Sequence, residues 1–244
     1  MKIVATIEAR MTSSRLPGKV LMEAAGKPML EHLVNRLKSV KSLDEIVLAT
    51  TINHADDQLE EFARKANIRC YRGSEDDVMR RVISAAESAE AEIIVEITGD
   101  CPIIDPQLVE QAISIFNFNE VDYISNAHVR SYPDGMDVQV LKLATLQHSL
   151  ELTDNKLDHE HVTLHIRNNP DIYSKINIIS PPETFWPNLG LTLDEQSDYD
   201  LLKIIIEYFE PINPLFSCRE VVSFLQAHPE LEEINKSVVR KGVT

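Results

Sequence analysis

The sequence predicts an α/β fold with a mainly parallel sheet flanked by helices. Short, β-rich apolar runs occupy residues 2–7, 46–51, 68–72 and 92–97. Each run is followed by a polar loop or turn and then by apolar residues at helical spacing. Such alternation is typical of parallel strands joined by crossover helices, and these sheets bind ligands at the carboxyl ends of their strands.

The helices expected between these strands cover residues 28–37, 56–67, 76–88 and 106–116. After residue 123 the alternation loosens. We expect strands at 136–142 and 173–179 and helices at 143–152, 158–168, 197–209 and 218–227. We interpret residues 126–180 as a small inserted lobe, used for acceptor binding or dimerisation, within a single domain spanning residues 1–244.

Composition limits the function classes. The net charge of −15 argues against a general nucleic-acid binder, because phosphate backbones are held by basic surfaces. Cys70, Cys101 and Cys218 are too widely spaced to indicate a disulfide framework or a thiolate zinc site. No apolar run approaches the roughly 20 residues that span a bilayer. We therefore expect a cytoplasmic protein without a membrane partner.

The first loop concentrates positive charge directly after the first strand. It places Arg10, Arg15 and Lys19 beside Ser13 and Ser14. Cationic side chains and backbone N–H groups in a turn can neutralise and orient a triphosphate. A solvated basic loop is the structural alternative. Neither a P-loop nor a dinucleotide-binding glycine motif is present, which disfavours P-loop ATPases and dinucleotide dehydrogenases.

A carboxylate follows the strand at residues 92–97. Asp100 comes after Gly99, which would let the backbone approach a ligand closely. Mg²⁺ needs only one or two protein carboxylates when phosphates complete its coordination. We expect Asp194 to be the second ligand and Asp198 to cap the following helix. The alternative is that Asp100 is a turn residue or a helix cap.

Two further segments carry polar groups. In R-G-S-E-D-D-V (residues 72–78), Ser74 is either a helix cap or part of a pocket wall near the base. Residues 125–138, with D-H-E-H-V-T further on, gather hydrogen-bonding side chains suited to sugar hydroxyls, and an arginine there suits an acidic group. The expected substrate-binding residues are Asn126, Arg130, Tyr132, Asp137 and His161.

Five segments occur in an order that identifies a resemblance. I-E-A-R-M-T-S-S-R-L-P-G-K-V-L, R-G-S-E-D-D-V, I-T-G-D-C-P-I-I-D, Y-P-D-G-M-D-V and H-E-H-V-T are similar to those of the spore coat polysaccharide biosynthesis protein F family. That family resembles the CMP-KDO and CMP-sialic acid synthetases. The resemblance covers nearly the whole chain.

The resemblance implies a Rossmann-like, glycosyltransferase-A-type nucleotidyltransferase fold, CTP as donor, Mg²⁺ as cofactor and a homodimer. Carried over by position, Arg10, Arg15 and Lys19 would contact the triphosphate. The backbone around Ala9 would contact the nucleoside, and Asp100 with Asp194 would hold the metal.

The sequence departs from the family at three positions. Glu8 replaces a usual Gln, which would affect base preference, and Thr12 replaces a Gly. The family's Arg-Trp-Thr-Val-Asp segment reads Gly190-Leu191-Thr192-Leu193-Asp194, so the aspartate is kept and the arginine is missing.

The function expected is transfer of CMP from CTP to a sugar, including a sugar acid, with release of pyrophosphate in surface polysaccharide or glycan precursor biosynthesis. No side-chain nucleophile is required, because positioning and charge stabilisation can supply most of the rate. Two alternatives stay open. One is a glycosyltransferase of the same fold type, and the other is a catalytically inactive nucleotide-binding regulator.

Overall fold

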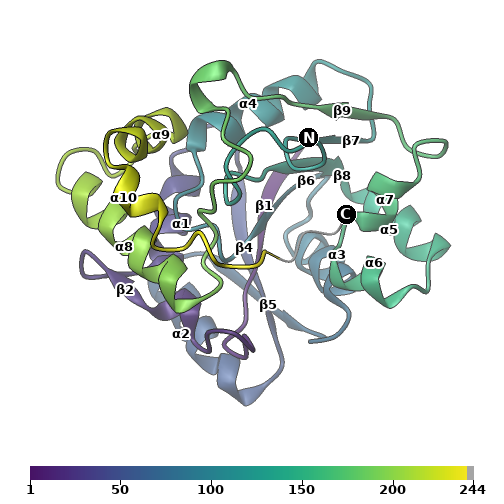
Figure 1. Ribbon diagram of the computed structural model, residues 1–244. Helices are drawn as coiled ribbons and strands as arrows, with labels where there is room; N and C mark the ends of the chain where they lie inside the picture. The colour runs from purple at the N-terminus through teal and green to yellow at the C-terminus, as the bar shows by residue number, and fades with distance from the viewer. Residues whose placement is uncertain (241–244) are drawn as a thin grey trace.

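A seven-stranded sheet runs through the centre of the computed structural model, which describes residues 1–240 (Figure 1). Its strands lie in the order β5-β4-β1-β6-β8-β7-β9. They are β1 (Ile3–Glu8), β4 (Glu45–Thr51), β5 (Arg69–Gly73), β6 (Ile93–Thr98), β7 (Tyr123–Ser125), β8 (Gln139–Lys142) and β9 (Lys175–Asn177). β5, β4, β1 and β6 are parallel, whereas β8 runs antiparallel to both β6 and β7. The predicted mainly parallel α/β fold is confirmed.

The order of strands places a crevice beside β1. From β1 the chain moves to β4 and β5 on one side, and then returns to β6 on the other side of β1. Glu8 and Thr98, the last residues of β1 and β6, are partners in the register. Loops that leave neighbouring strands at such a switch point diverge and leave room for a ligand. The loops after Glu8 and Thr98 are among the segments that the sequence predicted to carry chemistry.

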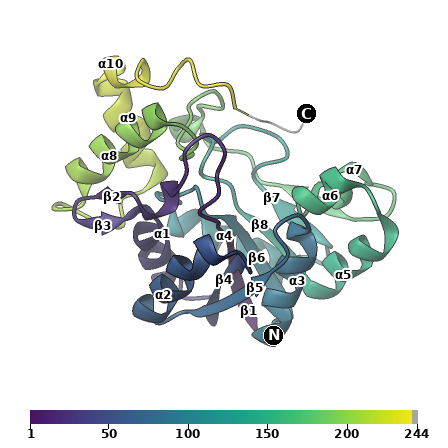
Figure 2. The same ribbon diagram turned by 90° about the horizontal axis from the view of Figure 1, so that it is seen from below.

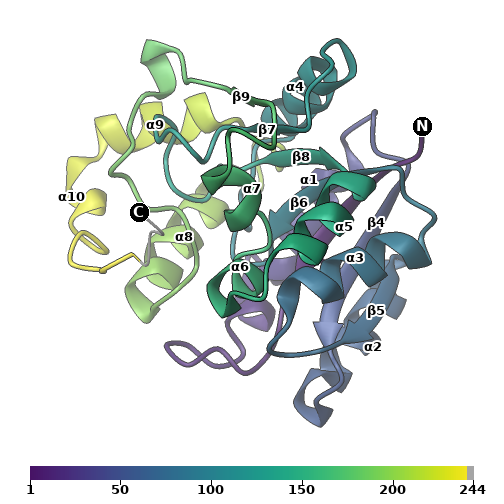
Figure 3. The same cartoon turned by 90° about the vertical axis from the view of Figure 1, so that its right-hand side faces the viewer.

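Helices cover both faces of the sheet (Figures 2 and 3). α1 (Met29–Lys38), α2 (Asp57–Ala66) and α4 (Pro106–Asn117) pack on one face, and α3 (Val78–Ser88) and α5 (Leu143–Leu152) pack on the other. Successive side chains of β1 point to opposite faces of the sheet, so β1 contributes to the apolar core on each face. Ile3, Ala5 and Ile7 face the first group of helices, and Val4 faces the second. No helix within residues 1–240 is long and apolar enough to cross a bilayer.

A third helical group stands apart from the sheet in Figure 2. It consists of α8 (Gln196–Phe209), α9 (Cys218–Ala227) and α10 (Pro229–Glu232). The buried faces of α8 and α9 pack against Leu189, Leu191 and Leu193, and the partly buried Leu231 of α10 packs against the same cluster. Arg36 on α1 ties this group to the sheet layer: its buried guanidinium donates to the carbonyl oxygens of Ile104 (2.7 Å), Pro214 (2.7 Å) and Phe216.

The segment from 126 to 180 contributes to the main sheet as well as to a helical face. It supplies β8 and β9 and the helices α5, α6 (Lys156–Glu160) and α7 (Leu164–Asn168). A single helix over 158–168 was expected, and this prediction is wrong. Val162 adopts a positive φ of 46° and is buried, and the Thr163 hydroxyl donates to Gln139 Oε1 at 2.5 Å, so the chain turns between the two short helices.

Three strands escaped the prediction because they are very short. β7 is only 3 residues long and depends on pairing with β8 and β9. Within the first loop, β2 (Glu23–Ala24) and β3 (Lys27–Pro28) form a hairpin whose turn residues Ala25 and Gly26 both have positive φ. The remaining connections include the 3₁₀ helices η1 (Lys19–Leu21), η2 (His54–Asp56) and η3 (Pro182–Thr184).

Replacing Arg36 with methionine will destabilise the fold. The change keeps an apolar stem but leaves the three carbonyl oxygens without their charged donor in a buried site. We expect a loss on the order of 3 kcal/mol in the free energy of unfolding, measured with urea. Arg64→Met is the control, because Arg64 is exposed and its ion pair is with Glu61 on the same helix. A loss below about 1 kcal/mol for Arg36→Met would contradict this account of the junction.

Candidate functional site

A cleft of about 560 Å³ opens at the carboxyl ends of β1 and β6. It is bounded by the first loop, the start of α3, the loop after β6, residues 130–137, the end of α6 and the segment before α8. Its charged and polar lining residues include Glu8, Arg10, Ser13, Ser14, Arg15, Lys19, Glu75, Asp76, Arg81, Thr98, Asp100, Arg130, Asp134, Asp137, Glu160, His161, Thr192, Asp194 and Arg240.

The first loop is held in place by two acidic side chains. The fully buried Asp56 accepts from the Met11 N–H at 2.7 Å. Glu75 accepts from Arg10 Nη1 at 2.9 Å and from the Thr12 hydroxyl at 2.8 Å. Thr12, one of the departures from the family, therefore fastens the loop to the segment before α3. Gly18, in a left-handed conformation (φ 72°), turns the chain into η1, which begins at Lys19.

Lys19 joins two carboxylates from distant parts of the chain. Its Nζ lies 3.1 Å from Asp100 Oδ2 and 3.0 Å from Asp194 Oδ1, and Arg15 Nη2 lies 2.7 Å from the same Asp194 oxygen. Burial disfavours the charge on Lys19, but the two carboxylates outweigh it and raise its pKa. Burial also disfavours a charged Asp194, yet Lys19, Arg15 and Arg240 lower its pKa. Lys19 and Asp194 are therefore both charged at neutral pH.

Gly99 allows the loop after β6 to lie against the end of β1. Its N–H donates to the Glu8 carbonyl oxygen at 2.9 Å. A Cβ at this position would lie 2.6 Å from that oxygen and 2.9 Å from the Ala9 Cβ, both too close. The glycine thus brings Asp100 next to the first loop, as its place after the strand predicted.

Asp100 and Asp194 fit the expected Mg²⁺ site. Two carboxylates that contact one ammonium group face a common point where a cation is stabilised. Both line the cleft, so phosphate oxygens and water can reach them. Hard oxygen ligands of this kind, in this number, suit Mg²⁺ bound together with a phosphate substrate. Within residues 1–240 no group of three or more His, Cys, Asp or Glu side chains is arranged to hold a metal.

A second cavity of about 550 Å³ adjoins the cleft. The two share Glu8, Thr98, Arg130, Asp137, Glu160 and His161, while Glu96, His128, Gln139 and Arg167 line the second cavity. Because of this shared wall, a ligand in the cleft and a ligand in the second cavity would contact the same residues. We refer to the second cavity as the adjoining cavity.

Buried acids line the adjoining cavity. Burial raises the pKa of Glu8, and the neighbouring Glu96 adds to the effect; neither Glu8 oxygen has a hydrogen-bond partner within residues 1–240. Burial likewise raises the pKa of Glu96 to about 7 and that of Asp137 to about 6. Gln139 Nε2 donates to Glu96 Oε2. Glu96 and Asp137 thus titrate near neutral pH.

Most of the predicted site residues meet in the cleft. The structure brings together the lining residues Glu8, Ala9, Arg10, Ser13, Ser14, Arg15, Lys19, Gly99, Asp100, Arg130, Asp137, His161 and Asp194. The role of each stays a prediction. Asp198 accepts from the N–H groups of Asp194 and Glu195 at the start of α8, as expected for a capping residue.

Three predicted contacts are corrected, because the residues lie outside the cleft. Asn126 is buried and its amide bonds the backbone, donating to the Met136 carbonyl oxygen and accepting from the Val138 N–H, each at 2.7 Å. Tyr132 is buried in the core beneath α8 and α9. Ser74 accepts from the Asp77 N–H at 3.0 Å, and Asp77 is the residue that caps α3.

Arg130 reaches the cleft but its charge is already balanced. Its Nη1 lies 2.9 Å from Asp134 Oδ1 and 3.1 Å from Asp137 Oδ2. An acidic ligand group would therefore compete with two carboxylates of the protein. His161 lines both the cleft and the adjoining cavity. Burial lowers its pKa, which favours the neutral imidazole at neutral pH.

Arg167 was not identified from the sequence, although it is the cation best suited to an anion in the adjoining cavity. Within residues 1–240 its guanidinium has no carboxylate within 4.0 Å, and its Nε is buried without a hydrogen-bond partner. Arg81 and Arg240 were also missed. Arg81, Arg167 and Arg240 do not lie in loops that follow strands. The expectation that ligand-binding residues follow the carboxyl ends of strands therefore could not identify them.

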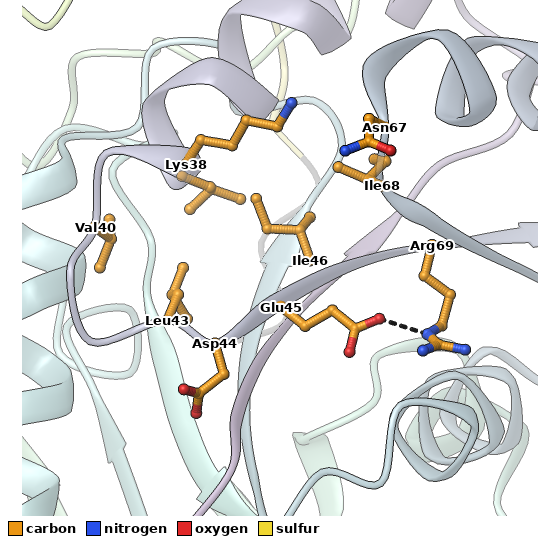
Figure 4. A pocket seen from close by; sticks show the side chains of 10 residues that line it. Lys38, Val40, Leu43, Asp44, Glu45, Ile46, Asn67, Ile68 and Arg69 are labelled. Atoms are coloured by element: carbon orange, nitrogen blue, oxygen red, sulfur yellow. Dashed lines mark hydrogen bonds and ion pairs between the residues drawn. The ribbon is translucent and has the colours of Figure 1, made fainter.

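Another pocket, of about 560 Å³, lies at the opposite edge of the sheet (Figure 4). It is formed where β4 and β5 begin, and the ion pair between Glu45 Oε1 and Arg69 Nε (2.6 Å) lies across it. It contains no predicted site residue, and it faces the amino ends of the parallel strands. It is therefore separate from the cleft.

Comparisons with known proteins point to one family. A family model described as cytidylyltransferase matches residues 4–218. Spore coat polysaccharide biosynthesis protein SpsF of Bacillus subtilis is 33% identical over 236 residues, which cover 93% of this chain and 95% of that protein. The 3-deoxy-manno-octulosonate cytidylyltransferase of Geobacter sulfurreducens is 33% identical over 149 residues, 59% of this chain and 58% of that protein. A solved cytidylyltransferase from Leptospira borgpetersenii superposes with a TM-score of 0.91 at 29% identity, covering 98% of this chain and 100% of that one.

Replacing Glu96 with glutamine will stabilise the protein at pH 8 but not at pH 4.5. The pKa of Glu96 rises from its ordinary 4.5 in the unfolded chain to about 7 in the folded protein. The folded state therefore binds an extra proton between these values, and stability falls as pH rises through them. Glutamine removes this dependence, so we expect a higher Tm than wild type at pH 8 only.

The control for this measurement is Glu151→Gln on the exposed surface of α5. A Tm gain for Glu96→Gln that is equal at both pH values would show that the Glu96 carboxyl is not the titrating group.

Proposed function

Because the chain belongs to the cytidylyltransferase family, we propose that it transfers CMP from CTP to a sugar hydroxyl and releases pyrophosphate. The observation that carries the proposal is the convergence of Arg15, Lys19, Asp100 and Asp194 at the carboxyl ends of β1 and β6. The family predicts this donor, and the charges in the cleft suit a triphosphate with its metal. We further propose that this reaction is a step in the biosynthesis of surface polysaccharides or glycan precursors.

The cations of the first loop would hold the triphosphate. Lys19 and Arg15 lie beside the carboxylates, and Arg10 lies further along the same cleft. Positioned cations stabilise the charge that develops on phosphate oxygens as the acceptor oxygen bonds to the α-phosphorus and the bond to the β-phosphate oxygen breaks. Asp100 and Asp194 would hold Mg²⁺, which when bound supplies further neutralisation of the phosphates.

The adjoining cavity would hold the acceptor. It shares lining residues with the cleft, so a hydroxyl bound there can face the α-phosphorus. Glu8, Asp137, Glu160 and His161 line both hollows and can accept the proton that the hydroxyl loses. The guanidinium of Arg167, which has no carboxylate partner among residues 1–240, favours an acceptor that carries a carboxylate, and the named substrate of the Geobacter sulfurreducens relative is a sugar acid.

The test is pyrophosphate release from CTP and Mg²⁺ with a panel of acidic and neutral sugars. Acceptor-dependent release with formation of a CMP-sugar supports the proposal. Transfer of a sugar from a nucleotide-sugar donor would favour the glycosyltransferase alternative, and nucleotide binding without any release would favour the inactive regulator. The homodimer stays a prediction, and sedimentation of the same preparation tests it.

Replacing Lys19 with alanine will lower kcat by about 10²- to 10³-fold. The change removes a positioned cation from the triphosphate site and leaves Asp100 and Asp194 without their shared ammonium group. Pyrophosphate release under saturating CTP measures the effect, and circular dichroism checks the fold. Lys41→Ala, at an exposed surface position, is the control. Near-normal turnover of Lys19→Ala would remove Lys19 from the mechanism.

Replacing Arg167 with alanine will raise KM for an acidic acceptor by about 10- to 100-fold, because a charge-assisted hydrogen bond is lost in a partly buried cavity. KM for CTP should stay within a factor of about 2, since Arg167 lines only the adjoining cavity. A neutral acceptor that is turned over serves as the internal control. Equal losses for acidic and neutral acceptors would contradict the assignment.

A further inference from the structure

The segment after α10 returns to the cleft. Figure 1 shows this part of the chain, in yellow, leaving the helical group and running across the middle of the molecule. The buried Asn235 donates from Nδ2 to the Gly190 carbonyl oxygen (2.9 Å) and to Asp198 Oδ1 (2.8 Å). Arg240 donates to the Thr192 hydroxyl (2.6 Å) and to Asp198 Oδ1 (2.8 Å). The segment is thus fastened to residues 190–198.

Asp198 connects this segment to the predicted metal ligand. Its carboxylate is fully buried. Oδ2 accepts from the backbone N–H groups of Asp194 (3.1 Å) and Glu195 (2.9 Å), and Oδ1 accepts from Asn235 and Arg240. A buried carboxylate without a cation is costly, so Arg240 stabilises the charge that holds the Asp194 backbone in place.

Gly190 provides the space for the Arg240 side chain. A Cβ at position 190 would lie 1.7 Å from Nη2, 1.8 Å from Cζ and 2.0 Å from Nε of Arg240. The backbone of Gly190 is not in the left-handed region, so alanine could adopt it without strain. The need for glycine here is therefore the volume that the guanidinium fills.

We propose that Arg240 is a positioning residue for this reaction, which fixes Asp194 at the cleft through Asp198 and depends on the absence of a side chain at position 190. The inference rests on the proposed function, because it assigns Asp194 to the reacting centre. Arg240 itself lines the cleft beside Thr192 and Asp194.

The test compares Arg240→Ala, Gly190→Ala and the double variant. Each single change removes or displaces the guanidinium, and we expect kcat to fall by about 10- to 100-fold, as is usual when a group supporting a metal ligand is lost. The double variant should be no worse than the more impaired single variant, because both changes break the same contact. Lys236→Ala is the matched control, since Lys236 lies in the same segment and its ion pair among the described residues is with Glu233.

A second readout follows the backbone directly. Amide hydrogen exchange of residues 194 and 195 should be faster in Arg240→Ala and Gly190→Ala than in wild type, because their N–H groups donate to Asp198. Faster exchange with full turnover, or additive losses in the double variant, would overturn the proposal. Lost turnover with unchanged exchange would overturn it too, because Arg240 would then act on the substrate itself.

The two proposals fail in different ways. If wild type releases no pyrophosphate with any acceptor, the proposed function fails. Amide exchange needs no turnover, so unchanged exchange in both single variants would still refute the link from Arg240 to Asp194.

Discussion

The contact of one ammonium group with two carboxylates organises the site. Lys19 follows the left-handed turn at Gly18, Asp100 follows the close approach of Gly99 to β1, and Asp194 precedes α8. Two carboxylates that contact the same ammonium group lie close enough to repel each other. Lys19 and Arg15 offset that repulsion, so three distant segments of the chain share one charged centre. The first loop, the sheet and the α8 segment therefore meet at one point.

The distribution of charge explains how so acidic a chain can bind a triphosphate. The net charge is −15, yet Arg10, Arg15, Lys19 and Arg81 line one cleft. Carboxylates among them serve two purposes. Glu75 holds the first loop in place, and Asp100 with Asp194 suits a metal. In the adjoining cavity, burial instead raises the pKa of Glu96 to about 7 and that of Asp137 to about 6.

The sequence predicted residues whose position follows from the topology. Parallel strands end at one edge, so Arg10, Lys19 and Asp100 could be brought together from the pattern alone. The sequence-based prediction failed for Asn126, because whether an amide faces a ligand or the backbone depends on the turn around it. It also failed for Arg240, whose contact with residues 190–198 spans more than 40 residues and follows no periodic signal. The sequence showed that position 190 lacks the family's arginine. Only the structure showed that the Arg240 guanidinium fills the space beside Gly190.

Calorimetric titration with CTP, UTP, GTP and ATP in turn, each with and without Mg²⁺, tests the central claim most directly. The claim is that the cleft at the ends of β1 and β6 binds a cytidine triphosphate with its metal. The account predicts tightest binding of CTP, a clear gain on adding Mg²⁺, and loss of that gain in Asp100→Ala. Binding of another triphosphate in preference to CTP, or no binding of any of the four, would contradict it.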